Sequence, residues 1–227
     1  MASNLVSVPD SRGIVRDALA IGVATGAYAL SFGAISITAG LNLLQTCALS
    51  ALMFTGASQF ALVGVVGSGG GVWAGVLTAG LLGSRNSLYA VRLASLLDLR
   101  AWRRPAASHF VIDETTAMAI ARDEVAASRY AFWATGLSVF IFWNLGTLIG
   151  ALVTHAIPNP RVLGLDAAPP AAYLALLAPR LRAREPLAIA LAAAIVAVVL
   201  LPFVPAGLPL LVIAVLVSLY GLARGRP

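Results

Sequence analysis

The chain has 227 residues, of which 60% are hydrophobic and only 11% charged, and its mean hydropathy is +0.93. A soluble globular protein carries about 25% charged residues. This chain therefore cannot cover a folded surface with polar groups, and a bilayer must serve as its solvent. The net charge of +6 comes from arginines that border apolar segments, which is typical of topology determinants rather than of a nucleic-acid surface. The single cysteine, Cys47, excludes a disulfide framework.

Two long stretches carry no charge. No Asp, Glu, Lys, Arg or His occurs at positions 18–84, a run of 67 residues, or at positions 186–223. About 20 apolar residues cross the hydrocarbon as a helix, so the first stretch has room for three crossings. The sequence predicts an all-α integral membrane protein with about seven transmembrane helices, at 17–40, 44–67, 72–97, 130–154, 162–179, 186–204 and 206–223.

A charged stretch divides the chain into two units of a single transmembrane domain (1–227). Its ten charged residues make segment 98–129 too polar to cross the membrane, and its helical spacing from His109 to Ala121 predicts a short helix near the interface. The first unit covers 17–97 and the second covers 130–204. A terminal helix at 206–223 follows.

The two units show a weak internal repeat. With an offset of 113 residues, Gly33 falls on Gly146, and Phe60 falls on Tyr173. Each unit then carries a helix-breaking patch in its second segment, near 56–59 and near 168–170. We therefore expect two pseudo-symmetric three-helix repeats of inverted topology with broken helices at these patches, an arrangement in which transporters place their binding site.

The arginine clusters leave two topologies open. If all seven segments cross fully, the clusters at 100–104, 180–184 and 224–226 fall on one side, which the positive-inside rule makes cytoplasmic, and the N-terminus lies outside. Alternatively the N-terminus is inside and one early segment, such as 44–67, is broken or re-entrant. Both alternatives fit a multi-pass protein of the bacterial inner membrane with a cytoplasmic C-terminus.

A run of small and polar residues interrupts the second apolar segment: Gly56, Ala57, Ser58 and Gln59. Such residues serve close helix packing, with Gln59 bonded across the interface. They also suit a locally unwound site, where free N–H groups at a half-helix start hold a substrate carboxylate. The matching interruption at Pro169 and Pro170 favours the second interpretation.

Three further polar residues are candidates for binding substrate. Arg85 and Asn86 lie within the third apolar segment. Either the span ends near Gly83 and the arginine reaches the interface, or Arg85 pairs with a substrate carboxylate or an acidic neighbour. Asn144 in the fourth segment needs hydrogen-bond partners in hydrocarbon, so it lies either at a helix contact or in a substrate pocket.

Three carboxylates are candidates for proton coupling. Asp113 and Glu114 follow directly after an apolar run, and Asp166 sits early in the fifth segment. The alternatives are solvated loop charges for the first two and a helix N-cap for Asp166. An intramembrane carboxylate is costly unless it has a function, which keeps a proton-handling role open for all three.

Enzyme chemistry has no support in the sequence. No HExxH, P-loop or nucleophile-elbow pattern occurs. Two histidines that lie far apart and one cysteine do not make a zinc site. The sequence therefore predicts a non-enzymatic membrane protein without a metal or cofactor.

Several motifs in fixed order resemble the AzlC family, the large subunit of two-component branched-chain amino acid exporters. They are Phe54-Thr55-Gly56-Ala57-Ser58-Gln59-Phe60, Arg85 with Leu88-Tyr89, Asp113-Glu114, Trp143-Asn144-Leu145-Gly146, Gly164-Leu165-Asp166 and Leu176-Leu177-Ala178-Pro179. The resemblance covers about 15–225. It departs around Arg85, where family members often carry Asn two places earlier and His just after, while this chain has Gly83 and Asn86.

The resemblance implies export of valine, leucine, isoleucine and other hydrophobic amino acids, driven by the proton motive force. It also implies a small AzlD-type membrane subunit as partner. A non-transporting scaffold or regulatory subunit, and an exporter of another small organic anion or amino acid, remain the rival hypotheses.

Overall fold

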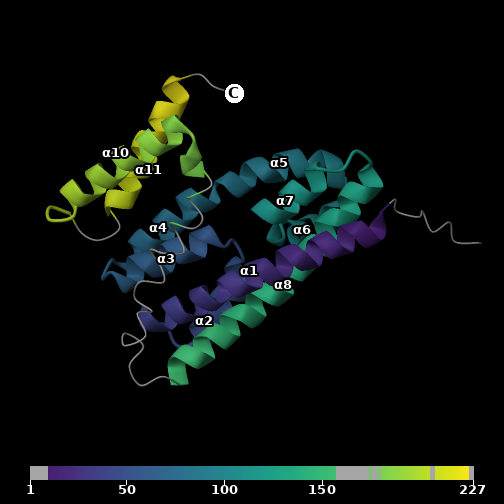
Figure 1. Cartoon of the computed structure of the whole chain (residues 1–227), viewed down its shortest axis with the longest axis horizontal. Helices are drawn as coiled ribbons and strands as arrows, with labels where there is room; N and C mark the ends of the chain where they lie inside the picture. The colour runs from purple at the N-terminus through teal and green to yellow at the C-terminus, as the bar shows by residue number, and fades with distance from the viewer. Residues whose placement is uncertain (1–9, 157–173, 175–177, 179, 205–207, 225–227) are drawn as a thin grey trace, which may run out of the picture.

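The computed structural model describes residues 10–156, 174, 178, 180–204 and 208–224. Within these residues the secondary structure is helical and contains no strand, which confirms the all-α prediction for this part of the chain. Two of the helices, α1 (Ser11–Thr38) and α8 (Val125–Ala156), are long and apolar enough to cross a membrane. The other helices are shorter; several of those between α1 and α8 in the sequence pack against this pair, whereas the two C-terminal helices lie apart from it (Figure 1).

Helices α1 and α8 lie side by side and run in the same direction (Figure 1). Asp17 near the start of α1 pairs with Arg122 just before α8 at 3.3 Å. Further along, the backbone of Gly26 meets that of Gly146, and Gly33 meets the carbonyl of Thr147. Because these glycines have no Cβ, the two backbones touch directly, and the pair forms the tightest contact of the fold.

The segment 44–67 folds back on itself. Its two halves, α2 (Leu43–Met53) and α3 (Ala57–Gly67), are each 11 residues long, about 16 Å, or half of the hydrocarbon thickness. Helix α2 starts directly after α1, and α3 ends with Gly67 against Ala39. Both ends of the segment therefore lie at the C-terminal end of α1, so the segment returns to the end from which it starts, and we call it the re-entrant hairpin.

The third apolar segment is divided into two helices. Helix α4 (Val72–Gly83) runs back along α3, with Gly75 near Leu62 and Gly83 near Ser58. After Ser84, α5 (Arg85–Leu97) continues toward the N-terminal end of α8, where the carbonyl of Leu96 accepts from Arg129 Nε at 3.0 Å. The division at Ser84 thus lies level with the tip of the α2–α3 hairpin.

Three short elements fill the space at the N-terminal ends of α1 and α8: the 3₁₀ turn η1 (Ala101–Arg103), α6 (Arg104–His109) and α7 (Asp113–Ile120). The helix expected between His109 and Ala121 therefore occurs as α7. Phe110 packs on Gly136, and Met118 packs on Ala127, so α7 runs antiparallel to α8.

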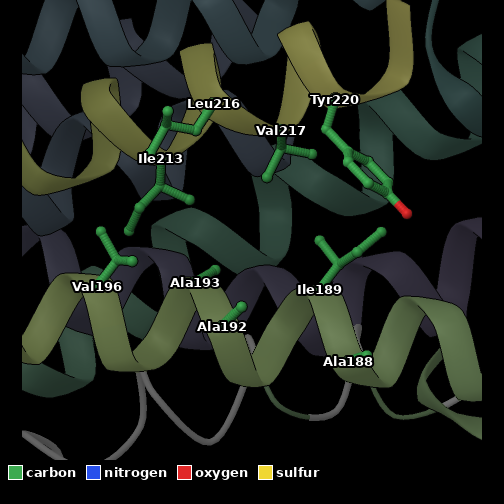
Figure 2. Close-up of a pocket in the computed structure, with 9 residues that line it drawn as sticks. All are labelled: Ala188, Ile189, Ala192, Ala193, Val196, Ile213, Leu216, Val217 and Tyr220. Atoms are coloured by element: carbon green, nitrogen blue, oxygen red, sulfur yellow. The ribbon is translucent and has the colours of Figure 1, made fainter. Parts of the chain in front are cut away.

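The C-terminal helices form a separate hairpin beside α4 (Figure 1). After the short turn η4 (Arg180–Arg182), α10 (Arg184–Leu200) and α11 (Leu208–Ala223) lie antiparallel, joined at one end by Arg224 and Glu185 at 3.0 Å. Figure 2 shows the groove of about 310 Å³ between them, lined by Ala188, Ile189, Ala192, Ala193, Val196, Ile213, Leu216, Val217 and Tyr220.

The parallel course of α1 and α8 corrects the expected repeat. Inverted repeats place equivalent helices in opposite directions, whereas the helices that carry Gly33 and Gly146 run the same way. The inverted relation inferred from the offset of 113 is therefore wrong for this pair. The offset treats 44–67 as one continuous helix, whereas the structure folds this segment into the α2–α3 hairpin.

Candidate functional site

The interruption expected near 56–59 lies at the tip of the re-entrant hairpin. Phe54 and Gly56 have φ angles of 35° and 61°, so the chain turns in the left-handed region between α2 and α3. Glycine adopts this conformation without steric cost. Ala57, Ser58 and Gln59 form the first turn of α3, whose first backbone hydrogen bonds are made by Gln59 and Phe60 to the Gly56 carbonyl.

Gln59 holds this tip together. Its side chain is completely buried, its Oε1 accepts from the Gly56 N–H at 3.0 Å, and its Nε2 donates to the Leu49 carbonyl at 2.8 Å. One amide thus joins the turn to α2: it satisfies the Gly56 N–H, which the broken helix leaves free, and adds a bond to the Leu49 carbonyl of α2. The geometry gives Gln59 a structural contact on both of its polar ends.

A groove of about 670 Å³ separates the tip from the α4–α5 division. It is lined by Met53, Thr55, Ser58, Leu62, Val76, Ala79, Gly80, Gly83, Ser84 and Ser87. Hydroxyl groups occupy its end at the tip, and aliphatic side chains with Gly80 occupy the rest. The groove is therefore amphipathic, unlike the apolar groove between α10 and α11.

Several buried polar atoms at this junction have no hydrogen-bond partner among the described residues. The hydroxyls of Thr55 and Ser58 are two of them, and Ser58 is only 1% exposed. Burying a hydroxyl without a partner costs about 1–3 kcal/mol. The N–H groups of Ala57 and Ser58 precede the first hydrogen bond of α3, so they are donors of the kind that hold anions at helix starts.

Aromatic side chains support the tip from behind. Tyr28, Phe60 and Trp143 pack with ring centroids 4.8–6.3 Å apart, and the Trp143 ring lies 3.8 Å from where a Cβ of Gly56 would be. On the other side, the Phe54 ring stacks on His109 at 5.6 Å. Rigid contacts on both sides fix the position of the turn.

Arg85 pairs with Asp113 rather than lining the groove. Its Nη2 lies 2.9 Å from Asp113 Oδ2, with 27% and 39% of the two side chains exposed. Arg85 Nε and Asp113 Oδ1 are buried and have no other partner in the described part of the chain. The pair joins the start of α5 to the start of α7, and Arg85 lies between the groove residues Ser84 and Ser87 in the chain.

Glu114 lies next to this pair in the first turn of α7, outside the membrane-spanning helices. Burial raises the pKa of its carboxyl above the ordinary value of 4.5, and the neighbouring Asp113 charge raises it further. The hydrogen bond to its own backbone and the Arg85 charge act in the opposite direction without cancelling the rise. The carboxyl therefore keeps its proton at higher pH than an exposed glutamate.

The remaining predicted site residues are dispersed. Asn86 follows Arg85 in α5 and is partly exposed. Asn144 donates through Nδ2 to the Phe140 carbonyl at 2.8 Å, within its own helix rather than across an interface. Asp166, Pro169 and Pro170 lie outside the described residues, as does the break expected near 168–170.

Sequence reasoning missed Gly80, Ser84 and Ser87 as groove residues. They recur at the three- and four-residue spacing of one helix face, and that spacing was the available signal. The division at Ser84 has no Pro or Gly-Gly pair to announce it. Only the packing of α3 against α4 brings these residues to the tip.

Comparison with known proteins adds the family. The family model described as "AzlC protein" matches residues 20–157, which is more than half of the chain and includes the hairpin, the groove and the Arg85–Asp113 pair. The chain belongs to the AzlC family. The resemblance found in the motifs is thereby confirmed. AzlC proteins are membrane proteins linked to amino-acid transport, not an enzyme family.

Two curated relatives extend the match. The chain is 28% identical over 141 residues to "Inner membrane protein YgaZ" of Escherichia coli (strain K12), covering 60% of this chain and 58% of that protein. It is 24% identical over 126 residues to "Uncharacterized membrane protein" of Helicobacter pylori, covering 55% of each. The chain thus spans little more than half the length of these relatives. No solved structure matches it.

Proposed function

We propose that this AzlC-family chain is the transporting subunit of a secondary exporter of branched-chain and other hydrophobic amino acids, coupled to protons. The single observation that supports it best is the amphipathic groove at the re-entrant tip, where buried hydroxyls without partners meet an aliphatic wall. A hydrophobic amino acid has the matching form, with a charged head group on an apolar side chain.

In this proposal the head group lies at the start of α3. The N–H groups of Ala57 and Ser58 bind the substrate carboxylate, with help from the Thr55 and Ser58 hydroxyls. Gly56 and Gln59 shape the turn that presents these donors. Asn86, Asn144, Pro169 and Pro170 remain proposed substrate contacts from the sequence alone.

Arg85, Asp113 and Glu114 supply the charges for coupling. Arg85 exchanges its contact with Asp113 for the substrate carboxylate as the substrate moves, and Asp113 and Glu114 take up or release protons at that moment. Support comes from the incompletely satisfied ion pair and from the raised pKa of Glu114. Asp166 keeps its proposed role in proton transfer.

The parallel pair supports one orientation in the membrane. The N-terminal ends of α1 and α8 carry Arg12, Arg16, Arg100, Arg103, Arg104, Arg122 and Arg129, whereas the turns at 39–42 and 68–71 carry no charge. By the positive-inside rule we place the arginine-rich end in the bacterial cytoplasm. Arg224 pairs with Glu185, so the end of α11 and the start of α10 lie at the same end of the antiparallel hairpin. We propose that this end, with the C-terminus, is also cytoplasmic.

The exporter proposal is tested with bacteria loaded with labelled leucine or valine, with this chain expressed alone, together with a small AzlD-type subunit, or deleted. We expect efflux to need the chain, to rise with the small subunit, and to stop when the proton gradient is collapsed. Efflux that is unchanged on deletion would favour the scaffold hypothesis. Efflux of other organic anions with no effect on leucine would favour the alternative substrate.

A further inference from the structure

We infer that the groove between α3 and α4 binds the substrate in one orientation, and that Gly80 sets the largest side chain that fits. This inference deepens the proposed export function and rests on it. It assigns the apolar end of the groove, which the family motifs do not include, as the determinant of substrate size.

The polar part of the groove lining favours a ligand over lipid as its occupant. Ser84 and Ser87 are exposed on its wall, and the Ser58 hydroxyl is buried in it without a partner among the described residues. Polar groups inside the span of an apolar helix pair are unfavourable against hydrocarbon. Ser58 lies on α3 beside the unpaired N–H groups, and Ser84 and Ser87 lie across the groove from it, a grouping that favours a polar head group as occupant.

The other end of the groove is aliphatic. Leu62 from α3 faces Val76, Ala79 and Gly80 from α4, and no described charged residue lines it. Once the head group is held at Ser58, a branched aliphatic side chain points along the groove toward these residues. The groove thus has a polar end that accepts every amino acid and an apolar end that distinguishes them by size.

Gly80 is the position at which this size can be changed without disturbing the fold. A Cβ added at Gly80 would have no heavy atom within 4 Å, whereas a Cβ at Gly83 would meet the Ser58 hydroxyl at 3.3 Å. Gly80 also lies in a regular helix, without a positive φ angle. A Cβ there meets no backbone or neighbouring side chain, and Gly80 lines the groove, so we expect a larger side chain to extend into the groove.

The test compares Gly80→Ala and Gly80→Leu with a matched control, Gly64→Ala and Gly64→Leu. Gly64 also has open space around its Cβ position but does not line the groove. Efflux of labelled alanine, valine and leucine is measured from loaded cells that express each full-length variant with the small subunit. Expression and membrane content are followed in parallel.

We expect Gly80→Leu to reduce leucine efflux about tenfold or more relative to alanine efflux, and Gly80→Ala to give a smaller change in the same direction. The Gly64 variants should keep the parental ratio. Ser58→Ala should lower efflux of all three amino acids without changing their ratio, because it acts on the common head group.

The outcomes separate the inference from the function. If the parent chain moves no amino acid, the export proposal fails. If the parent exports leucine and both Gly80 variants reach the membrane with an unchanged leucine-to-alanine ratio, the size-determining role is overturned while export stands. If Gly80→Leu does not accumulate, the Gly80→Ala ratio decides, and an equal shift in the Gly64 variants also overturns the inference.

Discussion

The α1–α8 pair and the α2–α5 region have similar apolar compositions but opposite construction. Helices α1 and α8 are uninterrupted over 28 and 32 residues and touch backbone to backbone. Helices α2 to α5 are 11, 11, 12 and 13 residues long and are interrupted at Phe54–Gly56 and at Ser84. We call the uninterrupted pair, α1 and α8, the frame. The interrupted region, α2 to α5, places polar atoms at its two breaks, which lie beside the middle of the frame.

The comparison also shows how each region is held. The frame relies on absent side chains, because Gly26, Gly33, Gly146 and Gly150 leave room for the opposite backbone. The interrupted region depends instead on a side chain that is present, because Gln59 joins the turn to α2. Substitutions should therefore damage the frame by adding atoms and the interrupted region by removing them.

The largest effect is expected at the frame. Gly146→Leu places a side chain against the Gly26 carbonyl, with the Ala29 Cβ only 3.1 Å from the new Cβ. Overpacking against backbone should cost about 3 kcal/mol or more, and little folded protein should remain in membranes, as judged by thermal unfolding in detergent. Gly221→Leu in α11, where a Cβ meets nothing within 4 Å, is the control. Equal stability of the two variants would contradict the role of the close α1–α8 contact in stabilising the fold.

The next effect is expected at the hairpin tip. Gln59→Leu leaves the Gly56 N–H and the Leu49 carbonyl without their side-chain partner, which should cost about 2 kcal/mol or more. Gln45 is a matched control, since its Oε1 accepts from the Asn42 N–H at 2.9 Å in the same way but at an exposed helix start. Gln45→Leu should cost below about 1 kcal/mol. The melting temperatures of the two variants are compared. A similar decrease in both would contradict a special role for Gln59.

A smaller structural effect with a large functional one is expected at Arg85 and Asp113. Because both side chains are partly exposed, loss of the ion pair should change stability by less than about 1 kcal/mol. Arg85→Gln should nevertheless lower leucine efflux by about tenfold or more through the lost charge-assisted hydrogen bond. The exchanged pair, Arg85→Asp with Asp113→Arg, should not restore efflux if Arg85 meets the substrate. Full recovery would make the pair purely structural.

The smallest effect is a pH dependence at Glu114. Since the folded protein holds this proton above pH 4.5 while the unfolded chain releases it, the stability due to the neutral carboxyl is complete at low pH and is lost as pH rises through the folded pKa. Glu114→Gln should therefore match the parent near pH 4 and unfold at a higher temperature than the parent at neutral pH. Parallel melting curves for the two proteins across this range would refute the burial of this carboxyl.

Local features of the fold were predictable from the sequence. The motif around Gly56 predicts an interruption because few other residues in that apolar run break a helix, and the charges of 98–129 predict a segment outside the hydrocarbon. Gln59 was correctly placed at the interruption. Its two hydrogen bonds were not predictable, because the choice between a ligand and Leu49 depends on how α2 approaches α3.

The direction of the chain after the interruption was not predictable. A broken crossing helix and a re-entrant hairpin have the same local signature of two apolar halves around a small-residue turn. Contacts with residues outside the segment distinguish the two arrangements. Ser50 of α2 donates to Thr147 of α8 at 3.1 Å, and Gly67 of α3 meets Ala39 at the end of α1. The arginine pattern allowed both topologies, and the parallel course of α1 and α8 is the one that the alternative with a broken or re-entrant early segment expects.

The re-entrant hairpin has a consequence for biogenesis. Its contact residue Thr147 is synthesised almost one hundred positions after Ser50, so the hairpin leaves the ribosome long before α8 can cover it. A nascent chain that stops before α8 lacks the surface on which α2 lies, and its polar tip is exposed to lipid or to the insertion machinery. The hairpin therefore acquires its final contacts only when α8 arrives beside α1.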